Sequence, residues 1–347
     1  MVRKERLELS RVTPLVPKTS ASTNSATLAT LPIKLIHYII MIYIIYYNND
    51  MKNIVFFTIY IIFFAILSSL IFSLLYMQFD EQPMITLSKT IKYGAILMCI
   101  IFIVPAMKYR NLYNRKLIGY LEPKIKFITN VLKGFLLSLI FMLPLLILFI
   151  SFDIRNINYN LFVFDKFFIY TLIFTLFISL LISFIEESFF RGIMIQKSNN
   201  FLSTCIVILL SSLIYSLFHF LKIPLIIDEN IYWYTGLREF ISIITNFYNI
   251  ITLDAACTLV LFGILLGTIR VKYKTISYCI GLHTGFVFII KTFKQNSSVN
   301  YESVYSNSYM ISSYDHFTGE LASIWITVVL FCYLLVIYHK MIYHKKL

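Results

Sequence analysis

Five ionisable residues stand inside or at the ends of long apolar stretches, where such side chains are costly. Glu186, Glu187 and Arg191 occur in LISFIEESFFRGIMIQ, and two histidines follow, His219 at the end of SSLIYSLFH and His283 within CIGLHTGFVFII. A charged side chain at the centre of a membrane helix costs about 2.5–3.5 kcal/mol on insertion scales. These residues are therefore the candidates for chemistry.

The two adjacent glutamates are expected to differ in their surroundings. Glu187 and Arg191 are four residues apart, so they share one helical face and can form an ion pair, whereas Glu186 points about 100° away. We expect Glu187 to be held ionised as structural support and Glu186 to face a cavity. The alternative is a solvated Glu/Arg cluster at the point where the helix leaves the membrane.

Helical rise places Glu186, His219 and His283 within the hydrocarbon layer, on three different helices. An acid and two imidazoles that converge in a buried cavity can activate water and stabilise an oxyanion, or can bind a metal. For each histidine alone, a hydrogen bond to a carbonyl group or to water is the simpler alternative.

The elements that must position these residues are membrane helices. The chain has 347 residues, of which 59% are hydrophobic and 14% charged, and its mean hydropathy is +0.79. Soluble domains have about 25% charged residues. We expect an all-α, polytopic membrane protein with about eight transmembrane helices and an intramembrane polar cavity. The apolar segments are 54–76, 93–107, 135–150, 167–185, 201–218, 255–269, 276–290 and 321–338.

The basic residues indicate the topology. With this threading, 22 of the 30 Lys and Arg residues fall on the side of the two termini, so both termini are predicted to be cytoplasmic, in an integral protein of the plasma (inner) membrane. The net charge of +13 raises nucleic acid as a partner, but no basic stripe with interleaved stacking aromatics exists, and that class is excluded. The five cysteines are isolated and indicate neither a disulfide framework nor a zinc knuckle.

Two further features are expected to be structural. Gly263 and Gly267 have the small-xxx-small spacing that lets membrane helices approach closely. The apolar outer connection 223–251, with Tyr232 and Trp233, could be a substrate gate, but we favour an ordinary loop of the aromatic belt.

These motifs resemble those of the CAAX-protease and bacteriocin-processing (CPBP, or Abi) family of intramembrane proteases, which includes the Ras-converting prenyl-protein endopeptidases. The family's E-E-x-x-x-R matches EESFFR, and its F-x-x-x-H is similar to YSLFH, with Tyr215 in the Phe position. An F-G-x-x-x-G-like helix is matched by Phe262, Gly263 and Gly267. The last motif, H-x-x-x-N, is matched at His283, but Val287 occupies the Asn position.

The resemblance covers residues 167–292 and implies hydrolysis of a peptide bond within the membrane. Glu186 would be the general base that activates water, His219 would assist it, and His283 would donate a hydrogen bond to the oxyanion. Glu187 and Arg191 would orient Glu186. Glu186, His219 and His283 could also hold zinc, and a metal-free glutamate mechanism is equally open. Val287 removes a donor that the family uses beside its last histidine, and the nearby Thr284 is a candidate replacement.

Three functions follow as hypotheses. The first is an intramembrane endopeptidase that acts on a membrane-associated or lipidated peptide or protein in the bilayer. The second is a non-catalytic relative that binds a membrane peptide or partner, as an immunity or scaffold protein would. The third, a transporter with a proton relay, is disfavoured because no inverted repeat and no paired broken helices are found.

The expected organisation has four parts. Residues 1–50 form a basic, Ser/Thr-rich arm with a short apolar segment, either an interfacial arm or an upstream start that is not native structure. Residues 51–164 hold the first three transmembrane helices, and 165–292 the CPBP-like core. Residues 293–347 hold an outer loop, the last transmembrane helix and a basic tail.

Overall fold

The computed structural model describes residues 49–78, 85–158, 166–196, 201–221, 231–247, 251–306 and 310–343. These residues all belong to one compact unit, Asn49–Leu347. The predictions for the N-terminal arm concern residues that lie, apart from its last two, outside the described ranges.

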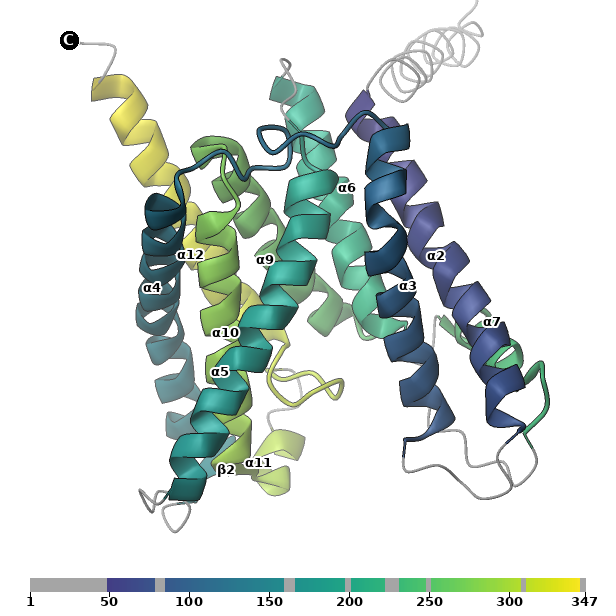
Figure 1. The fold of residues 1–347 in the computed structure, drawn as a ribbon. Helices are drawn as coiled ribbons and strands as arrows, with labels where there is room; N and C mark the ends of the chain where they lie inside the picture. Colours follow the sequence, from purple (N-terminus) through teal and green to yellow (C-terminus); the bar gives the residue numbers. More distant parts are fainter. Residues whose placement is uncertain are drawn as a thin grey trace, which may run out of the picture. The chain divides into compact units, whose positions relative to one another are not determined.

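Eight long helices occupy the eight predicted apolar segments, and the all-α, polytopic membrane architecture is confirmed (Figure 1). The helices are α2 (Asn49–Tyr76), α3 (Leu87–Tyr109), α4 (Lys124–Ser151), α5 (Lys166–Glu187), α6 (Phe201–Phe220), α9 (Leu253–Tyr273), α10 (Ser277–Gln295) and α12 (Glu320–Tyr343).

Seven of these eight helices are long and apolar enough to cross a membrane by length and composition, and α10 is the exception among the eight. Its first half is polar for a membrane helix, with His283 and Thr284 between two glycines, yet the whole run 279–286 is buried. Helix α10 packs against α4 and α5. Neighbouring helices, rather than lipid, therefore surround its polar part.

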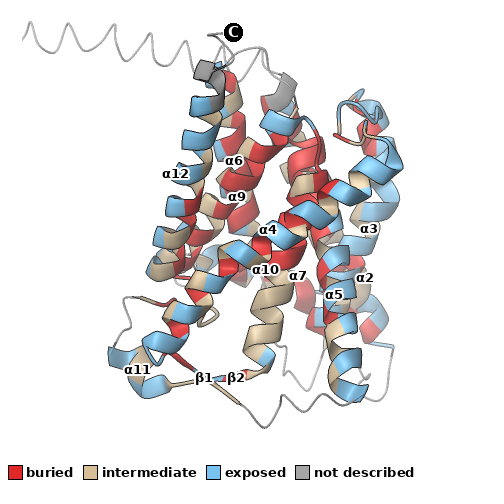
Figure 2. Ribbon diagram, turned by 90° about the vertical axis from the view of Figure 1, so that its left-hand side faces the viewer, coloured by how far each residue is buried: buried red, intermediate tan, exposed pale blue. Residues whose placement is uncertain are grey.

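The buried residues concentrate on the helices that carry the candidate site. Helix α6 packs against α9, α12 packs against α9, and α2 packs against α3. Figure 2 shows buried residues running along α6, α9 and the first half of α10, whereas α12 is mostly exposed or intermediate. Many large aliphatic and aromatic side chains are exposed, among them Ile173, Phe177 and Phe331. This pattern fits a bundle whose outer surface faces lipid.

The helix ends extend beyond the predicted boundaries. Helix α4 begins at Lys124 and not at Phe135. The hydropathy of the sequence did not indicate its first turns, because they carry lysines and other polar residues. Helix α3 likewise begins at Leu87 and includes Lys89 and Lys92. A helix can continue past the hydrocarbon layer as long as its backbone hydrogen bonds are made.

Several short elements were not predicted. A π-helix, η2 (Ser188–Ile193), follows α5 directly. The strands β1 (Arg155–Ile157) and β2 (Ser297–Val299) form an antiparallel pair, with Arg155 opposite Val299, and α11 (Tyr301–Ser306) follows β2. Because β1 follows α4 and β2 follows α10, the pair ties together the same ends of these two neighbouring helices.

The favoured interpretation of residues 223–251 as an ordinary loop was wrong for its middle, where α7 (Thr235–Thr245) forms. Helix α7 packs against α2, and the Gly236 amide donates a hydrogen bond to Ser73 Oγ over 2.9 Å. Tyr232 and Trp233, just before α7, remain exposed as aromatic-belt residues do. Residues 222–230 and 248–250 lie outside the described ranges.

The predicted close packing at Gly263 and Gly267 is confirmed. A Cβ atom on Gly263 would lie 2.7 Å from Ser212 Cβ, and one on Gly267 would lie 2.8 Å from Ile208 Cγ2. Both neighbours are on α6, so these glycines set the close approach of α9 and α6.

A second pair of glycines, Gly281 and Gly285, sets the approach of α10 to α4. A Cβ atom on Gly281 would lie 2.8 Å from the Val131 carbonyl carbon and 2.9 Å from Phe135 N, which are backbone atoms that cannot rotate away. We expect Gly281→Ala to destabilise the protein by about 3 kcal/mol. Gly267→Ala, whose Cβ would meet isoleucine side chains and not backbone atoms, should cost less. Thermal unfolding of both variants in the same detergent checks this order.

Candidate active site

The buried ion pair predicted between Glu187 and Arg191 is present. Arg191 Nη1 donates to Glu187 Oε1 over 3.0 Å, and the two side chains are 1% and 0% exposed. Glu187 is the last residue of α5 and Arg191 lies within the π-helix η2. The Arg191 guanidinium also lies over the Tyr215 ring, 4.5 Å from its centroid. Since a buried charge needs a partner, the pair explains how this turn can be enclosed.

His283 joins the same carboxylate from α10. Its Nδ1 donates to Glu187 Oε1 over 2.8 Å. A carboxylate accepts but does not donate, so this contact places the proton of a neutral His283 on Nδ1 and leaves Nε2 as an acceptor. Glu187 therefore holds both Arg191 and His283 in place through a single oxygen atom.

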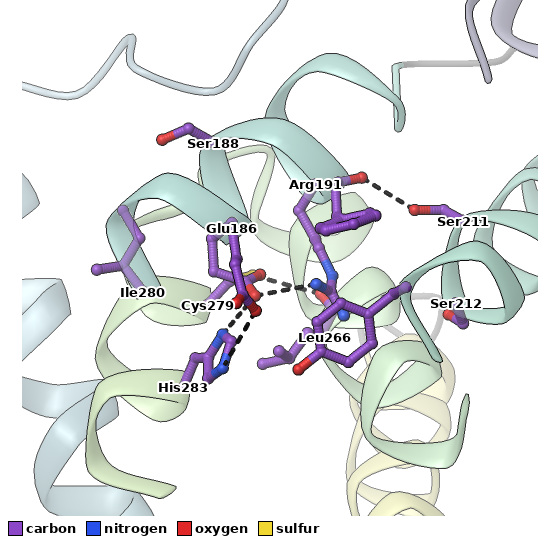
Figure 3. Close-up of polar contacts among 12 residues, drawn as sticks. Glu186, Ser188, Arg191, Ser211, Ser212, Leu266, Cys279, Ile280 and His283 are labelled. Atoms are coloured by element: carbon purple, nitrogen blue, oxygen red, sulfur yellow. Dashed lines mark hydrogen bonds and ion pairs between the residues drawn. The ribbon is translucent and has the colours of Figure 1, made fainter. Parts of the chain in front are cut away.

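Glu186 occupies a different environment from its neighbour. Its side chain is 28% exposed, and Oε2 lies 3.8 Å from His283 Nε2, which is longer than a hydrogen bond. Oε2 has no hydrogen-bond partner among the described residues. Figure 3 shows the Glu186 and His283 side chains pointing toward one another from α5 and α10. The carboxylate thus has hydrogen-bonding capacity that the folded chain does not use.

His219 reaches the site from the end of α6. Its Nδ1 donates to the Tyr215 carbonyl over 2.8 Å, and its ring centroid lies 4.5 Å from that of Tyr215. The His219 carbonyl accepts a hydrogen bond of 2.8 Å from the Tyr314 hydroxyl. Because the Tyr215 carbonyl can only accept, the neutral His219 ring also carries its proton on Nδ1.

Glu186, His219 and His283 line one cavity of about 270 Å³. Tyr215 and Tyr314 also border it. The rest of the lining is mainly apolar and comes from α4, α5, α9, α10 and α12: Met142, Leu145, Ile182, Leu259, Phe262, Phe286, Val287, Ile290, Ala322 and Ile326. A polar corner in an apolar cavity is typical of sites that bind a largely apolar ligand and orient it through a few polar groups.

Val287 and Thr284 differ in their relation to this cavity. Val287 lines it and offers no hydrogen-bond donor. Thr284 is buried, is not among the lining residues, and its hydroxyl donates to the Ile280 carbonyl over 2.7 Å. Thr284 was the candidate replacement for the missing donor, and the structure does not place it at the cavity.

Sequence reasoning missed Arg270, which supports the π-helix. Its Nε donates to the Arg191 carbonyl over 3.0 Å and its Nη2 donates to the Leu117 carbonyl over 2.7 Å, while the residue is only 6% exposed. In the sequence, Arg270 is one of the 22 basic residues that indicate the cytoplasmic side. The signal that could have distinguished it is its place on the last apolar turn of α9, three residues after Gly267.

The connection 310–319 between α11 and α12 borders the cavity as well. Phe317 and Thr318 join Tyr314 and Asp315 in the lining. Lys294 Nζ on α10 contacts Asp315 Oδ2 at 2.9 Å, and Asp315 Oδ1 accepts hydrogen bonds from the Thr318 amide and hydroxyl. Burial raises the pKa of the Tyr314 hydroxyl to about 12, with the charge of Asp315 adding to the effect.

The charge of Asp315 should make this connection sensitive to acid. Burial works against ionisation of Asp315, but Lys294 and the Thr318 hydrogen bonds outweigh it and hold the carboxyl pKa below its usual range. The stabilisation is therefore present at neutral pH and is lost as pH falls through the lowered pKa of the folded state. We expect Asp315→Asn to lower the free energy of unfolding by about 1.5–3 kcal/mol at neutral pH and to change it little in acid. Thermal unfolding at both pH values checks this.

The fit of a zinc ion can be judged from the donor set. Among the residues that the structure describes, no three His, Cys, Asp or Glu side chains are grouped so that they could hold one metal ion. Glu186 and His283 approach each other, and Nδ1 of each histidine is hydrogen-bonded, as the second ring nitrogen of a zinc-binding histidine usually is. The uptake of zinc stays an untested prediction.

The fold and the site define a polytopic membrane protein with acidic and histidine side chains around an intramembrane cavity. Residues 168–289, which hold all five predicted site residues, match the family model described as type II CAAX prenyl endopeptidase Rce1-like. This match supports, over these residues, the resemblance to the CPBP family of CAAX proteases. No curated protein and no solved structure matches the chain.

Proposed function

We propose that the protein is an intramembrane endopeptidase that hydrolyses a peptide bond of a membrane-associated or lipidated peptide or protein. The observation that carries the proposal is the Glu186 carboxylate, which faces an apolar cavity with no hydrogen-bond partner for Oε2 among the described residues, while the adjacent Glu187 is fully buried and paired. A carboxylate in such a position can serve as a general base.

The proposed reaction needs only water and the peptide. A water molecule between Glu186 and His219 gives a proton to the Glu186 carboxylate as its oxygen attacks the peptide carbonyl carbon. The carbonyl oxygen becomes an oxyanion. When the C–N bond breaks, the protonated Glu186 returns that proton to the leaving amine, and the new carboxylic acid then loses its own proton, so that a carboxylate and an ammonium group result.

The two histidines support this sequence in different ways. His219 assists by accepting a hydrogen bond from the attacking water through Nε2, because Nδ1 is bound to the Tyr215 carbonyl. His283 is held by Glu187 through Nδ1, so its Nε2 can donate to the oxyanion only when the ring carries both protons. Glu187 and Arg191 act as positioning residues, since they hold His283 and the turn that follows Glu186.

The orientation in the membrane is part of the proposal. The connection between α3 and α4 and the turn between α9 and α10 lie together, as the Arg270–Leu117 and Ile276–Gly119 hydrogen bonds show. Both are rich in Lys and Arg. We therefore assign this end of the bundle, and both chain termini, to the cytoplasmic side of the plasma (inner) membrane.

One observation favours a second function. Val287 gives the cavity wall no donor where an oxyanion would need one, which suits a protein that binds a membrane peptide or partner without cleaving it. A binder of this kind would hold its partner equally well with and without the Glu186 carboxylate.

The deciding experiment is cleavage of prenylated and unprenylated membrane peptides by the purified protein in lipid, read by mass spectrometry in ¹⁸O-labelled water. We expect wild-type products that carry ¹⁸O in the new carboxylate and are absent with Glu186→Ala. A zinc chelator in a parallel reaction tests for metal dependence. If neither the wild-type protein nor Glu186→Ala cleaves any peptide and both bind the peptides equally well, the protease hypothesis is overturned in favour of the binder.

A further inference from the structure

Tyr215 lies at the centre of the candidate site, and its ring is fixed from several sides. The residue is 2% exposed. Its ring centroid lies 4.5 Å from that of His219 and 6.2 Å from that of His283, and the Arg191 guanidinium covers one face. The Phe190 ring contacts it edge-on at 5.2 Å. A ring held in this way presents its hydroxyl in a defined direction.

The Tyr215 hydroxyl makes no hydrogen bond with any described residue, whereas buried tyrosine hydroxyls usually find a partner. It is not among the buried side-chain atoms that are sealed off without a partner. Tyr215 lines the cavity together with Glu186, His219 and His283. The hydroxyl therefore reaches the cavity and is available to a bound molecule.

The other donors around the cavity are engaged or conditional. The Tyr314 hydroxyl donates to the His219 carbonyl, and the Thr258 and Thr318 hydroxyls bond to Gly319 and Asp315. Each neutral histidine carries its proton on Nδ1 and offers only a lone pair at Nε2. A tyrosine hydroxyl, by contrast, carries a proton at neutral pH, because its ordinary pKa is about 10.

We propose that Tyr215 is a further catalytic residue, whose hydroxyl donates a hydrogen bond to the oxyanion that forms when water attacks the peptide carbonyl. The inference rests on the endopeptidase function proposed above. The hydroxyl keeps its proton throughout, so it adds no step to the proton transfers assigned to Glu186. At neutral pH, the Tyr215 hydroxyl therefore supplies a hydrogen-bond donor to the oxyanion. Val287 has no such donor, and His283 provides one only when its ring is doubly protonated.

The test is Tyr215→Phe, which removes the hydroxyl and keeps the ring contacts with His219, His283 and Arg191. We expect kcat to fall by about 10²- to 10³-fold, as for loss of one oxyanion donor, with KM within about threefold of wild type, because the bond forms only in the transition state. The Tm should not fall, since no hydrogen bond of the folded protein is lost.

Tyr60→Phe is the matched control. The Tyr60 hydroxyl of α2 donates to the Cys99 carbonyl over 2.7 Å, and Tyr60 is not a cavity residue. This variant should have a lower Tm and unchanged kcat. The inference alone would be overturned if Tyr215→Phe kept kcat within about threefold of wild type while Glu186→Ala was inactive. A drop in Tm equal to that of Tyr60→Phe would indicate a structural role and would overturn it too. If the wild-type protein cleaves no peptide, the proposed function and this inference are both overturned.

Discussion

Replacement of Glu186 by glutamine should lower turnover of a membrane peptide by about 10²- to 10⁴-fold, the range that general base catalysis supplies. Glutamine has nearly the same shape and keeps a hydrogen-bond acceptor, but it cannot take a proton from water. KM should change little, because the cavity wall that contacts the peptide stays intact. Steady-state cleavage of the membrane peptide that the wild-type protein cleaves best measures both constants.

The same variant should fold at least as well as the wild-type protein. Glu186 Oε2 has no hydrogen-bond partner among the described residues, so the carboxylate contributes little to stability and its charge is costly to enclose. We expect an unchanged or higher Tm. Glu302→Gln, at an exposed residue of α11, is the matched control and should change neither activity nor Tm. Wild-type turnover in Glu186→Gln would remove Glu186 from the mechanism.

Loss of the Arg191 charge should have the largest effect on stability. Arg191→Met leaves the Glu187 carboxylate fully buried with only His283 as a partner. Breaking a buried ion pair from one side costs about 3–5 kcal/mol. We expect a markedly lower Tm in detergent and a loss of activity, because Glu187 then no longer fixes both His283 and the turn after Glu186.

The double variant Glu187→Gln with Arg191→Met separates charge from packing. Arg191 Nη2 and Glu187 Oε2 each lack a hydrogen-bond partner among the described residues, so the pair is incompletely satisfied even in the native protein. Removal of both charges should therefore recover a large part of the stability that Arg191→Met loses. Turnover should stay low in the double variant, because His283 has lost its carboxylate. Additive losses of Tm would contradict the assigned coupling.

The eight long helices could be predicted because apolar segments of sufficient length are the main requirement of a bilayer. Their ends could not, since the first turns of α3 and α4 carry lysines and continue beyond the apolar segments. The strands β1 and β2 have three residues each, and their pairing joins segments about 140 positions apart. Such short, distant contacts leave no periodic pattern in the sequence.

The five predicted site residues were recognisable because charge inside an apolar stretch is rare and costly. The structure brings Glu187, Arg191 and His283 into contact, places Glu186 Oε2 3.8 Å from His283 Nε2, and places His219 at the same cavity. The i,i+4 spacing was sufficient to predict the Glu187–Arg191 pair. The catalytic roles remain predictions that the variants above test.

Other site residues left weaker signals in the sequence. Arg270 stands beside Lys272 and Lys274, so it reads as one more cytoplasmic charge until its contacts with the Arg191 and Leu117 carbonyls are known. Asp315 belongs to a polar connection, and nothing local shows that this connection returns to the cavity. Tertiary packing, and not local pattern, decides the position of both.

The π-helix η2 makes the site dependent on the number of residues in one turn. A π-turn accommodates about one residue more than an α-turn, and its i→i+5 bond is seen from the Met194 amide to the Phe189 carbonyl. A deletion of one residue here would restore α-helical phase and rotate the following segment by about 100° relative to Glu187. Insertions and deletions, more than substitutions, are therefore the changes that this stretch should tolerate least during the divergence of related chains.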